Sequence, residues 1–95
     1  MRYVIHAYDH TDSEALARRM AARAAHFDYV RQFSALGKFI MGGALLDPAG
    51  QMIGSMLVLE LESQAELDTY LAGDPYVVQR VWNTIDTHPF MPANL

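Results

Sequence analysis

Hydrophobic and polar residues alternate with a period of two in several stretches of the chain. Arg2–Tyr8 alternates β-branched and aromatic residues with others, which predicts a strand. Lys38–Leu46 and Gln51–Leu61 are two further predicted strands, and the residues Asp47–Gly50 between them are typical of a type I turn. These two strands therefore form a hairpin. Val81–Phe90 is the last predicted strand.

A long helix is predicted between the first strand and the hairpin. It begins near Ser13 and ends at Leu36, because Gly37 is a natural left-handed stop. Thr11 and Glu14 have the spacing of a capping box in front of it. The side chains expected to form its buried stripe are Leu16, Met20, Phe27, Val30 and Ser34.

A second helix follows the hairpin. Ser63 and Glu66 have capping-box spacing at its start, and Gly73 ends it. Asp74 and Pro75 then open a further short turn of helix, because aspartate is favoured at the N-cap and proline at the first helical position.

The resulting order, β-α-β-β-α-β, predicts an α+β protein of the ferredoxin-like class. Right-handed crossovers leave few other ways to pack two helices on one face of an antiparallel sheet. At 95 residues the chain is expected to be a single domain, 1–95.

The third predicted strand is apolar on both sides, which indicates how many layers must cover the sheet. Ile53, Leu57, Leu59 and Leu61 alternate with Met52, Met56 and Val58. Both faces of the sheet therefore need cover, and the helices supply only one layer. We expect a homodimer in which two sheets pack face to face. The alternative is an exposed apolar patch, which monomers tolerate when it is small.

Composition narrows the classes of partner. Apolar residues make up 52% of the chain and charged residues 19%, which indicates a packed core. A net charge of -4 argues against nucleic acid, because phosphate binding needs clustered Lys and Arg. No apolar run is long enough for a membrane span or a signal peptide, so we expect no membrane association and a cytoplasmic location. The absence of cysteine excludes disulfides and thiolate nucleophiles.

His26 and Asp74 are the candidate catalytic pair. His26 lies one residue before Phe27, about 100° around the helix from it, so it borders the predicted core. A partly buried structural histidine is the alternative. Asp74 is explained by capping alone, but a capping carboxylate can also hold one ring N–H of a histidine. The other ring nitrogen is then free to act as a general base towards a substrate.

Five further residues are candidates for binding a small molecule. Arg23 stands one turn before His26 and would attract an anion. Gly43 would let a ligand approach a strand, although a β-bulge is the more common reason for such a glycine. Ser55 is either a donor in the pocket or bonded to a nearby carbonyl. Tyr8 and Tyr76 would wall a pocket for a flat ligand, or simply pack.

A metal site is not expected. The histidines are His6, His10, His26 and His88, and no acidic residue has a diagnostic spacing from them. No glycine-rich phosphate loop or serine nucleophile elbow is present either, so we expect no cofactor.

The whole chain resembles the YciI-like (YCII-related domain) family of small cytoplasmic proteins. The matching elements are Tyr8, Arg23–His26, Gly37, Gly42–Gly43, Gly54–Ser55, Glu62–Ser63, Asp74–Tyr76 and Pro89–Phe90. The resemblance implies a ferredoxin-like fold, a dimer like that of the dimeric α+β barrels, and His26 with Asp74 as the active-site pair. It also implies proton transfer on small cyclic or aromatic acids, by isomerisation or elimination. Ala44, where the family commonly has proline, and Arg80, where it often has glycine, depart from the pattern.

Two functions follow from these residues. The first is a small cofactor-free enzyme in which His26 exchanges a proton with the substrate while Asp74 orients the imidazole. The second is a non-catalytic module that binds a small molecule in the same pocket. The sequence alone does not separate them.

Overall fold

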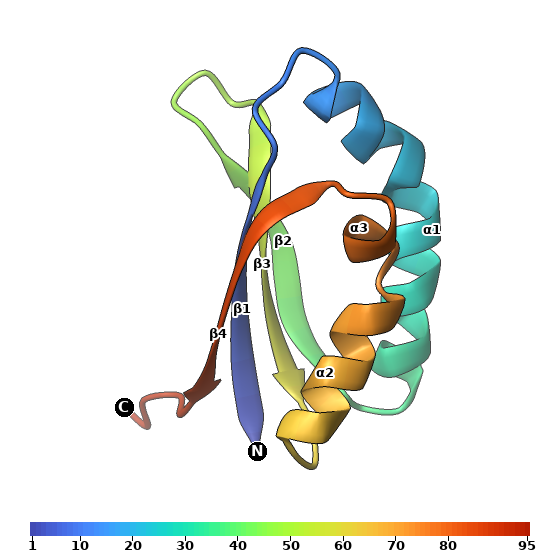
Figure 1. Cartoon of the computed structure of the whole chain (residues 1–95). Helices are drawn as coiled ribbons and strands as arrows, with labels where there is room; N and C mark the ends of the chain where they lie inside the picture. The colour runs from blue at the N-terminus through green and yellow to red at the C-terminus, as the bar shows by residue number, and fades with distance from the viewer.

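The computed structural model describes all 95 residues, and its elements occur in the predicted order (Figure 1). Three helices and four strands make up the chain. Their bounds are β1 (Arg2–Asp9), α1 (Ala15–Ala35), β2 (Phe39–Leu46), β3 (Met52–Glu60), α2 (Gln64–Gly73), α3 (Pro75–Val78) and β4 (Trp82–Phe90). The α+β class and the βαββαβ order are therefore confirmed.

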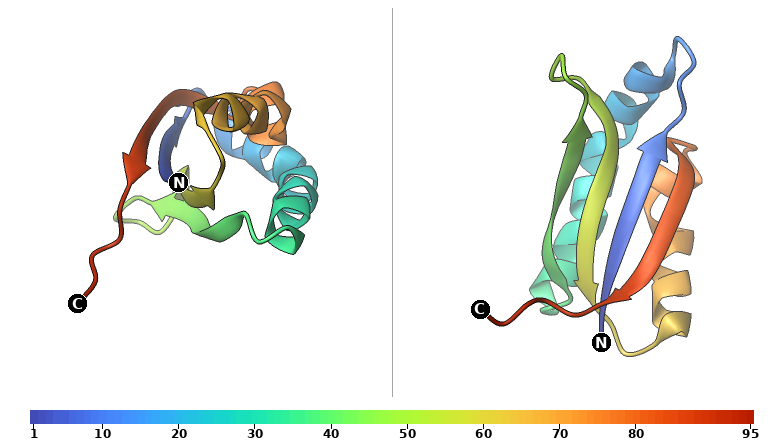
Figure 2. Two further views of the ribbon diagram at one scale, coloured as in Figure 1. Left: turned by 90° about the horizontal axis from the view of Figure 1, so that it is seen from below. Right: turned by 90° about the vertical axis from the view of Figure 1, so that its left-hand side faces the viewer.

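The four strands form one antiparallel sheet in the order β2-β3-β1-β4. All helices lie on one side of this sheet, and the opposite side is open in the view that looks onto the strands (Figure 2). Helix α1 lies behind β2 and β3, whereas α2 and α3 lie behind β1 and β4 (Figure 2). The arrangement is the ferredoxin-like one, with the core between the sheet and the helices.

The core is built from the inward-facing residues of the central strands and from α2 and α3. Successive side chains of a strand point to opposite faces, so Ile5 and Ala7 of β1 face the same layer as Leu57 and Leu59 of β3. All four are at most 2% exposed. Outside these two strands, the largest members of the same cluster are Leu61, Leu67, Tyr70, Tyr76 and Trp82.

Local turn and cap signals act largely as predicted. The amide of Gly50 donates to the carbonyl oxygen of Asp47 over 2.9 Å, which closes the hairpin turn. Ser63 caps α2, since its hydroxyl accepts from the amide of Glu66. The predicted capping box of Thr11 and Glu14 is wrong. The amide of Glu14 donates instead to the side chain of Asp12, two residues before it. Both carboxylates and hydroxyls cap helices, so the nearer acceptor is used.

Helix α1 buries a different face from the one its apolar pattern predicts. Its most buried residues include Arg19, Ala22 and His26, which are three and four positions apart and so share one face. Small Ala22 lets the helix approach the sheet, and the two polar side chains find partners inside the fold. The predicted stripe residues that remain more than a third exposed are Leu16, Met20, Phe27 and Ser34. Val30 alone of the stripe packs against the core, and it is partly buried.

The sheet face opposite the helices carries apolar side chains. Met41 of β2 is 56% exposed there, and Met56 and Val58 of the neighbouring β3 point to the same face. No helix of the protein covers this face (Figure 2). The homodimer therefore stays a prediction. No helix combines the length and apolar character needed to cross a membrane.

Gly54→Ala is expected to destabilise the fold by about 2 kcal/mol, as typical overpacking does. A Cβ at Gly54 would collide with the backbone carbonyl oxygen of Ala7 on β1, so the two central strands would have to separate. Urea denaturation measures the loss. Gly43→Ala is the matched control, because a Cβ there meets nothing within 4 Å. Equal stability of the two variants would contradict the prediction.

Candidate active site

A cavity of about 290 Å³ lies between α1 and the β2–β3 side of the sheet. Helix α1 supplies one wall, the glycine-containing part of β2 and the middle of β3 supply the other, and Tyr76 of α3 closes one end. Gly42, which pairs with the helix-facing Leu57, has no side chain to fill this space. Gly43 pairs with Met56 and so faces the other side of the sheet, and it lines the cavity with its backbone. Of the 14 lining residues 7 are hydrophobic, so the cavity combines apolar walls with polar groups that can bind a ligand.

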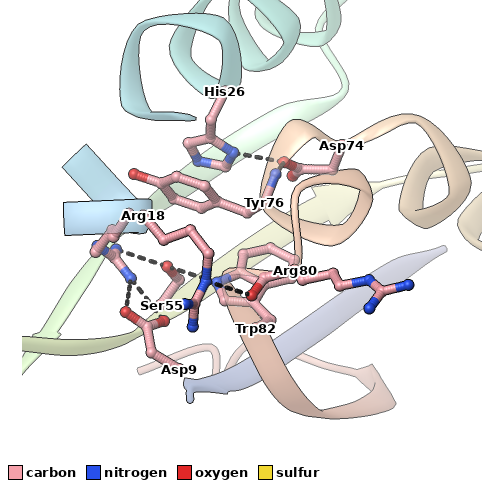
Figure 3. A network of polar contacts seen from close by, with 9 residues as sticks. Asp9, Arg18, His26, Ser55, Asp74, Tyr76, Arg80 and Trp82 are labelled. Atoms are coloured by element: carbon pink, nitrogen blue, oxygen red, sulfur yellow. Dashed lines mark hydrogen bonds and ion pairs between the residues drawn. The ribbon is translucent and has the colours of Figure 1, made fainter. Parts of the chain in front are cut away.

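His26 and Asp74 meet at this cavity although they are 48 residues apart in the chain. Nδ1 of His26 lies 2.7 Å from Oδ1 of Asp74. The histidine is 7% exposed and lines the cavity, and the aspartate is fully buried behind it. Figure 3 shows the imidazole from α1 pointing at the carboxylate where α2 gives way to α3.

Asp74 is held in place by three hydrogen bonds. Besides His26, its carboxylate accepts from the backbone amide of Tyr76 over 2.9 Å and from the hydroxyl of Tyr70 over 2.7 Å. The first bond is the predicted N-cap of α3. Burial, reinforced by the charge of Asp74, raises the pKa of Tyr70 far above its ordinary value, so this hydroxyl stays protonated and donates.

This geometry defines the tautomer of His26. Asp74 acts as an acceptor towards its other two partners, so Nδ1 of His26 carries the proton that points at it. Nε2 is then the nitrogen with a free lone pair. The ring cannot turn easily, because it stacks on Tyr76 at a centroid distance of 3.9 Å and meets the edge of Trp82 at 6.1 Å. A fixed imidazole with a free nitrogen at a cavity is equipped to accept and return protons.

A second polar network lies beside the first. Arg19 donates to both carboxylate oxygens of Asp9, at 2.9 and 3.0 Å, and to the hydroxyl of Ser55 at 2.9 Å. Trp82 also donates to Ser55, over 3.2 Å (Figure 3). Burial raises the pKa of Asp9, and the bonds from Arg19 oppose that shift. Both lone pairs of Ser55 are occupied, so its own O–H is left to donate.

Arg23 supplies positive charge at the cavity without a carboxylate partner. Its guanidinium carbon lies 4.6 Å from the ring centre of Phe27, and the charge is balanced by no ion pair. Arg31, two turns further on, also lines the cavity but is paired with Asp28 over 3.0 Å. The mouth of the cavity is therefore favourable for an anion.

The structure brings most of the predicted site residues together. His26 lines the cavity, with Asp74 behind it, and so do four of the predicted binding residues, Arg23, Gly43, Ser55 and Tyr76. Tyr8 does not line the cavity. Its neighbours on β1, Ala7 and Asp9, face the helices, so Tyr8 points from the other side of the sheet and is 46% exposed.

Four residues of the site were missed from the sequence: Asp9, Arg19, Tyr70 and Trp82. One signal was available, since Arg19 is seven residues before His26 and shares its helix face. A polar residue two turns from the candidate base indicates a polar interior. Asp9, Tyr70 and Trp82 lie on other elements, and no local sequence pattern connects them with the site.

The YCII-related domain, as a sequence family, matches residues 1–90. The chain belongs to this family. Two relatives, each named protein YciI, come from Escherichia coli O6:H1 and Shigella flexneri. Each is 31% identical over 96 residues, covering 95% of this chain and 96% of the relative.

Two solved structures share the fold. One is 5-chloro-2-hydroxyhydroquinone dehydrochlorinase from Burkholderia phenoliruptrix AC1100, in complex with 2,5-dihydroxybenzoquinone. It has a TM-score of 0.87 and 24% identity, covering 98% of this chain and 96% of that one. The other is protein Atu4242 from Agrobacterium tumefaciens, with a TM-score of 0.55 and 16% identity, covering 98% and 94%. These similarities support the YCII family fold described above.

Proposed function

We propose that this YCII-family chain is a small cofactor-free enzyme that moves a proton on a small anionic, cyclic or aromatic compound, as an isomerase or a lyase. The observation that carries the proposal is the 2.7 Å contact between His26 Nδ1 and buried Asp74 at the cavity. His26 is the general base and acid, and Asp74 orients it. Asp74 also stabilises the imidazolium that forms when Nε2 takes a proton.

The rest of the cavity supports a small oxygenated anion as substrate. Arg23 offers a charge that no protein carboxylate neutralises, and Ser55 offers an O–H that donates to no protein group. The apolar walls and the glycine backbone of β2 favour a flat ring. The cavity volume of about 290 Å³ is large enough for a compound with a single ring.

The dehydrochlorinase of the same fold is consistent with this proposal. Its name states the removal of hydrogen chloride from a chlorinated hydroxyhydroquinone, and its complex contains 2,5-dihydroxybenzoquinone. Removal of hydrogen chloride includes loss of a proton from the substrate, and a histidine held by an aspartate is equipped for that step. The proposal for this chain takes from that enzyme only the class of reaction and of compound.

A screen for exchange of carbon-bound hydrogen tests the proposal. Hydroxylated, carboxylated and quinonoid ring compounds are incubated with the protein in D₂O, and ¹H NMR follows loss of signal or release of a leaving group. We expect at least one compound to react with the wild type and not with the His26→Asn control. Saturable binding of such compounds with no reaction across the panel would favour the non-catalytic binding module.

We also propose that residues 1–95 act as one domain that pairs with a second copy through the uncovered sheet face. Met41 is 56% exposed on that face, and an apolar strand surface there is best covered by its own symmetric copy. Sedimentation equilibrium is expected to give twice the chain mass of 10.7 kDa. A single-chain mass at micromolar concentration would refute the dimer.

A further inference from the structure

The backbone amide and the ring of Tyr76 both make contacts within the protein, whereas its hydroxyl makes no hydrogen bond. Its amide donates to Asp74, and one ring face stacks on His26 with an interplanar angle of 9°. The guanidinium carbon of Arg19 lies 4.8 Å from the ring centre. These contacts hold the ring, and therefore the direction of its C–O bond, in one position.

The hydroxyl itself has no protein partner and reaches the cavity. Tyr76 is only 1% exposed, yet it lines the cavity. Among fully enclosed side-chain polar atoms, Nε of Arg19 alone lacks a hydrogen bond, so the unpaired oxygen of Tyr76 is not sealed in the core. Figure 3 shows it at the end of the ring that points away from Asp74. Buried polar groups are normally paired, so this group is arranged for a ligand.

Its chemistry in the cavity is that of a donor. Burial raises the pKa of Tyr76, and the nearby arginines, Arg19 and Arg23, lower it by less. The phenol therefore keeps its proton at neutral pH. Nε2 of His26, in contrast, is an acceptor in the tautomer that Asp74 selects. An acceptor and a donor on two stacked rings thus stand next to each other at one cavity.

We propose that Tyr76 is a second catalytic residue, whose hydroxyl donates a hydrogen bond to the substrate oxygen that becomes negative when His26 removes a proton from a neighbouring carbon. This inference rests on the proposed function and names its substrate class: a small anionic, cyclic carbonyl compound with an acidic C–H on the saturated carbon beside the C=O group.

The electrons and protons of this step balance within the site. The C–H bond breaks and its proton goes to Nε2 of His26. The electron pair of that bond forms a C=C bond, and the π pair of the carbonyl moves onto oxygen, where Tyr76 stabilises it without losing its proton. Return of the proton from His26 to a different carbon completes an isomerisation. Expulsion of an anion from the next carbon completes an elimination.

Tyr76→Phe tests the inference, because phenylalanine keeps the stacked ring and the backbone cap of Asp74 and removes only the hydroxyl. The probe is 2,5-dihydroxybenzoquinone, a flat ring that carries negative oxygens as the proposed intermediate does. Its dissociation constant is measured by calorimetry. We expect it to rise about 10- to 100-fold in the variant, the usual effect of losing a hydrogen bond to a charged group.

Tyr29→Phe is the matched control. Its hydroxyl donates to the carbonyl oxygen of Tyr70 and lies outside the cavity, so the dissociation constant should stay within about twofold of the wild type. A second readout is direct. With ¹³Cζ-labelled tyrosine, one resonance should shift when the probe binds, and it should be the resonance that is absent from the Tyr76→Phe spectrum.

The outcomes separate the two proposals. Binding by the wild type that is equally tight in Tyr76→Phe, with an unmoved Tyr76 resonance, overturns the role of Tyr76 and leaves the His26 chemistry intact. Failure of the wild type to bind the probe at millimolar concentration overturns the proposed class of substrate, and the inference with it. Weakened binding together with the shifted resonance supports both.

Discussion

Turnover by the His26→Asn protein is expected to be about 10²- to 10⁴-fold below that of the wild type, the usual contribution of general acid–base catalysis. Asparagine retains an N–H that can donate to Asp74, so the buried carboxylate keeps a partner. It has no group that takes up a proton and returns it near neutral pH. The loss should therefore appear in kcat, with substrate binding little changed.

The rate is measured by ¹H NMR in D₂O on the compound identified by the exchange screen. His88→Asn is the control, because His88 is exposed on β4 and does not line the cavity. It should retain the wild-type rate. A His26→Asn rate within a few-fold of the wild type, in a folded protein, would remove His26 from the mechanism and leave the cavity as a binding site.

The Arg19→Met protein is expected to lose about 3–5 kcal/mol of stability, as proteins do when one partner of a buried ion pair is removed. The side chains of Arg19 and Asp9 are only 3% and 5% exposed. Methionine has a similar length, so the space stays filled. Asp9 is then left without its cation, and Ser55 loses one of its two donors.

Urea denaturation measures this loss against that of Arg18→Met. Arg18 is the neighbouring residue and forms an equally short ion pair with Asp12, but at the surface, where such pairs contribute little. The double variant Asp9→Asn/Arg19→Met removes the unpaired charge and should recover part of the stability. Equal effects of Arg19→Met and Arg18→Met, with additive behaviour in the double variant, would contradict a buried network centred on Arg19.

Part of the site could be predicted because its signals are local. Asp74 followed by Pro75 is an N-cap pattern, and the structure confirms the cap through the bond from the Tyr76 amide. The hairpin at Asp47–Gly50 and the cap at Ser63 are confirmed for the same reason. Each depends on residues within four positions of one another, whose geometry hardly changes with the rest of the fold.

The buried face of α1 was predicted wrongly, and the reason is also physical. Apolar spacing assigned the core stripe to Leu16, Met20, Phe27, Val30 and Ser34, since the apolar side of a surface helix usually packs towards the core. Of these five, only Val30 packs against the core. In the fold, His26 and Arg19 occupy the interior instead. They do so because long-range partners satisfy their polar groups, and a helix pattern contains no information about those partners.

Sequence alone therefore determined the family, the order of strands and helices, and the two residues that meet as a dyad. The order of strands and helices is encoded in residue types and short spacings, whereas the pairing of His26 with Asp74, 48 residues apart, was implied by the resemblance to the family. Only the tertiary structure decided which face of α1 is inside, that Tyr8 lies away from the cavity, and that Arg19, Tyr70 and Trp82 support the site. These features arise where elements distant in the chain come together, and burying a polar group is favourable only when its partner is already there.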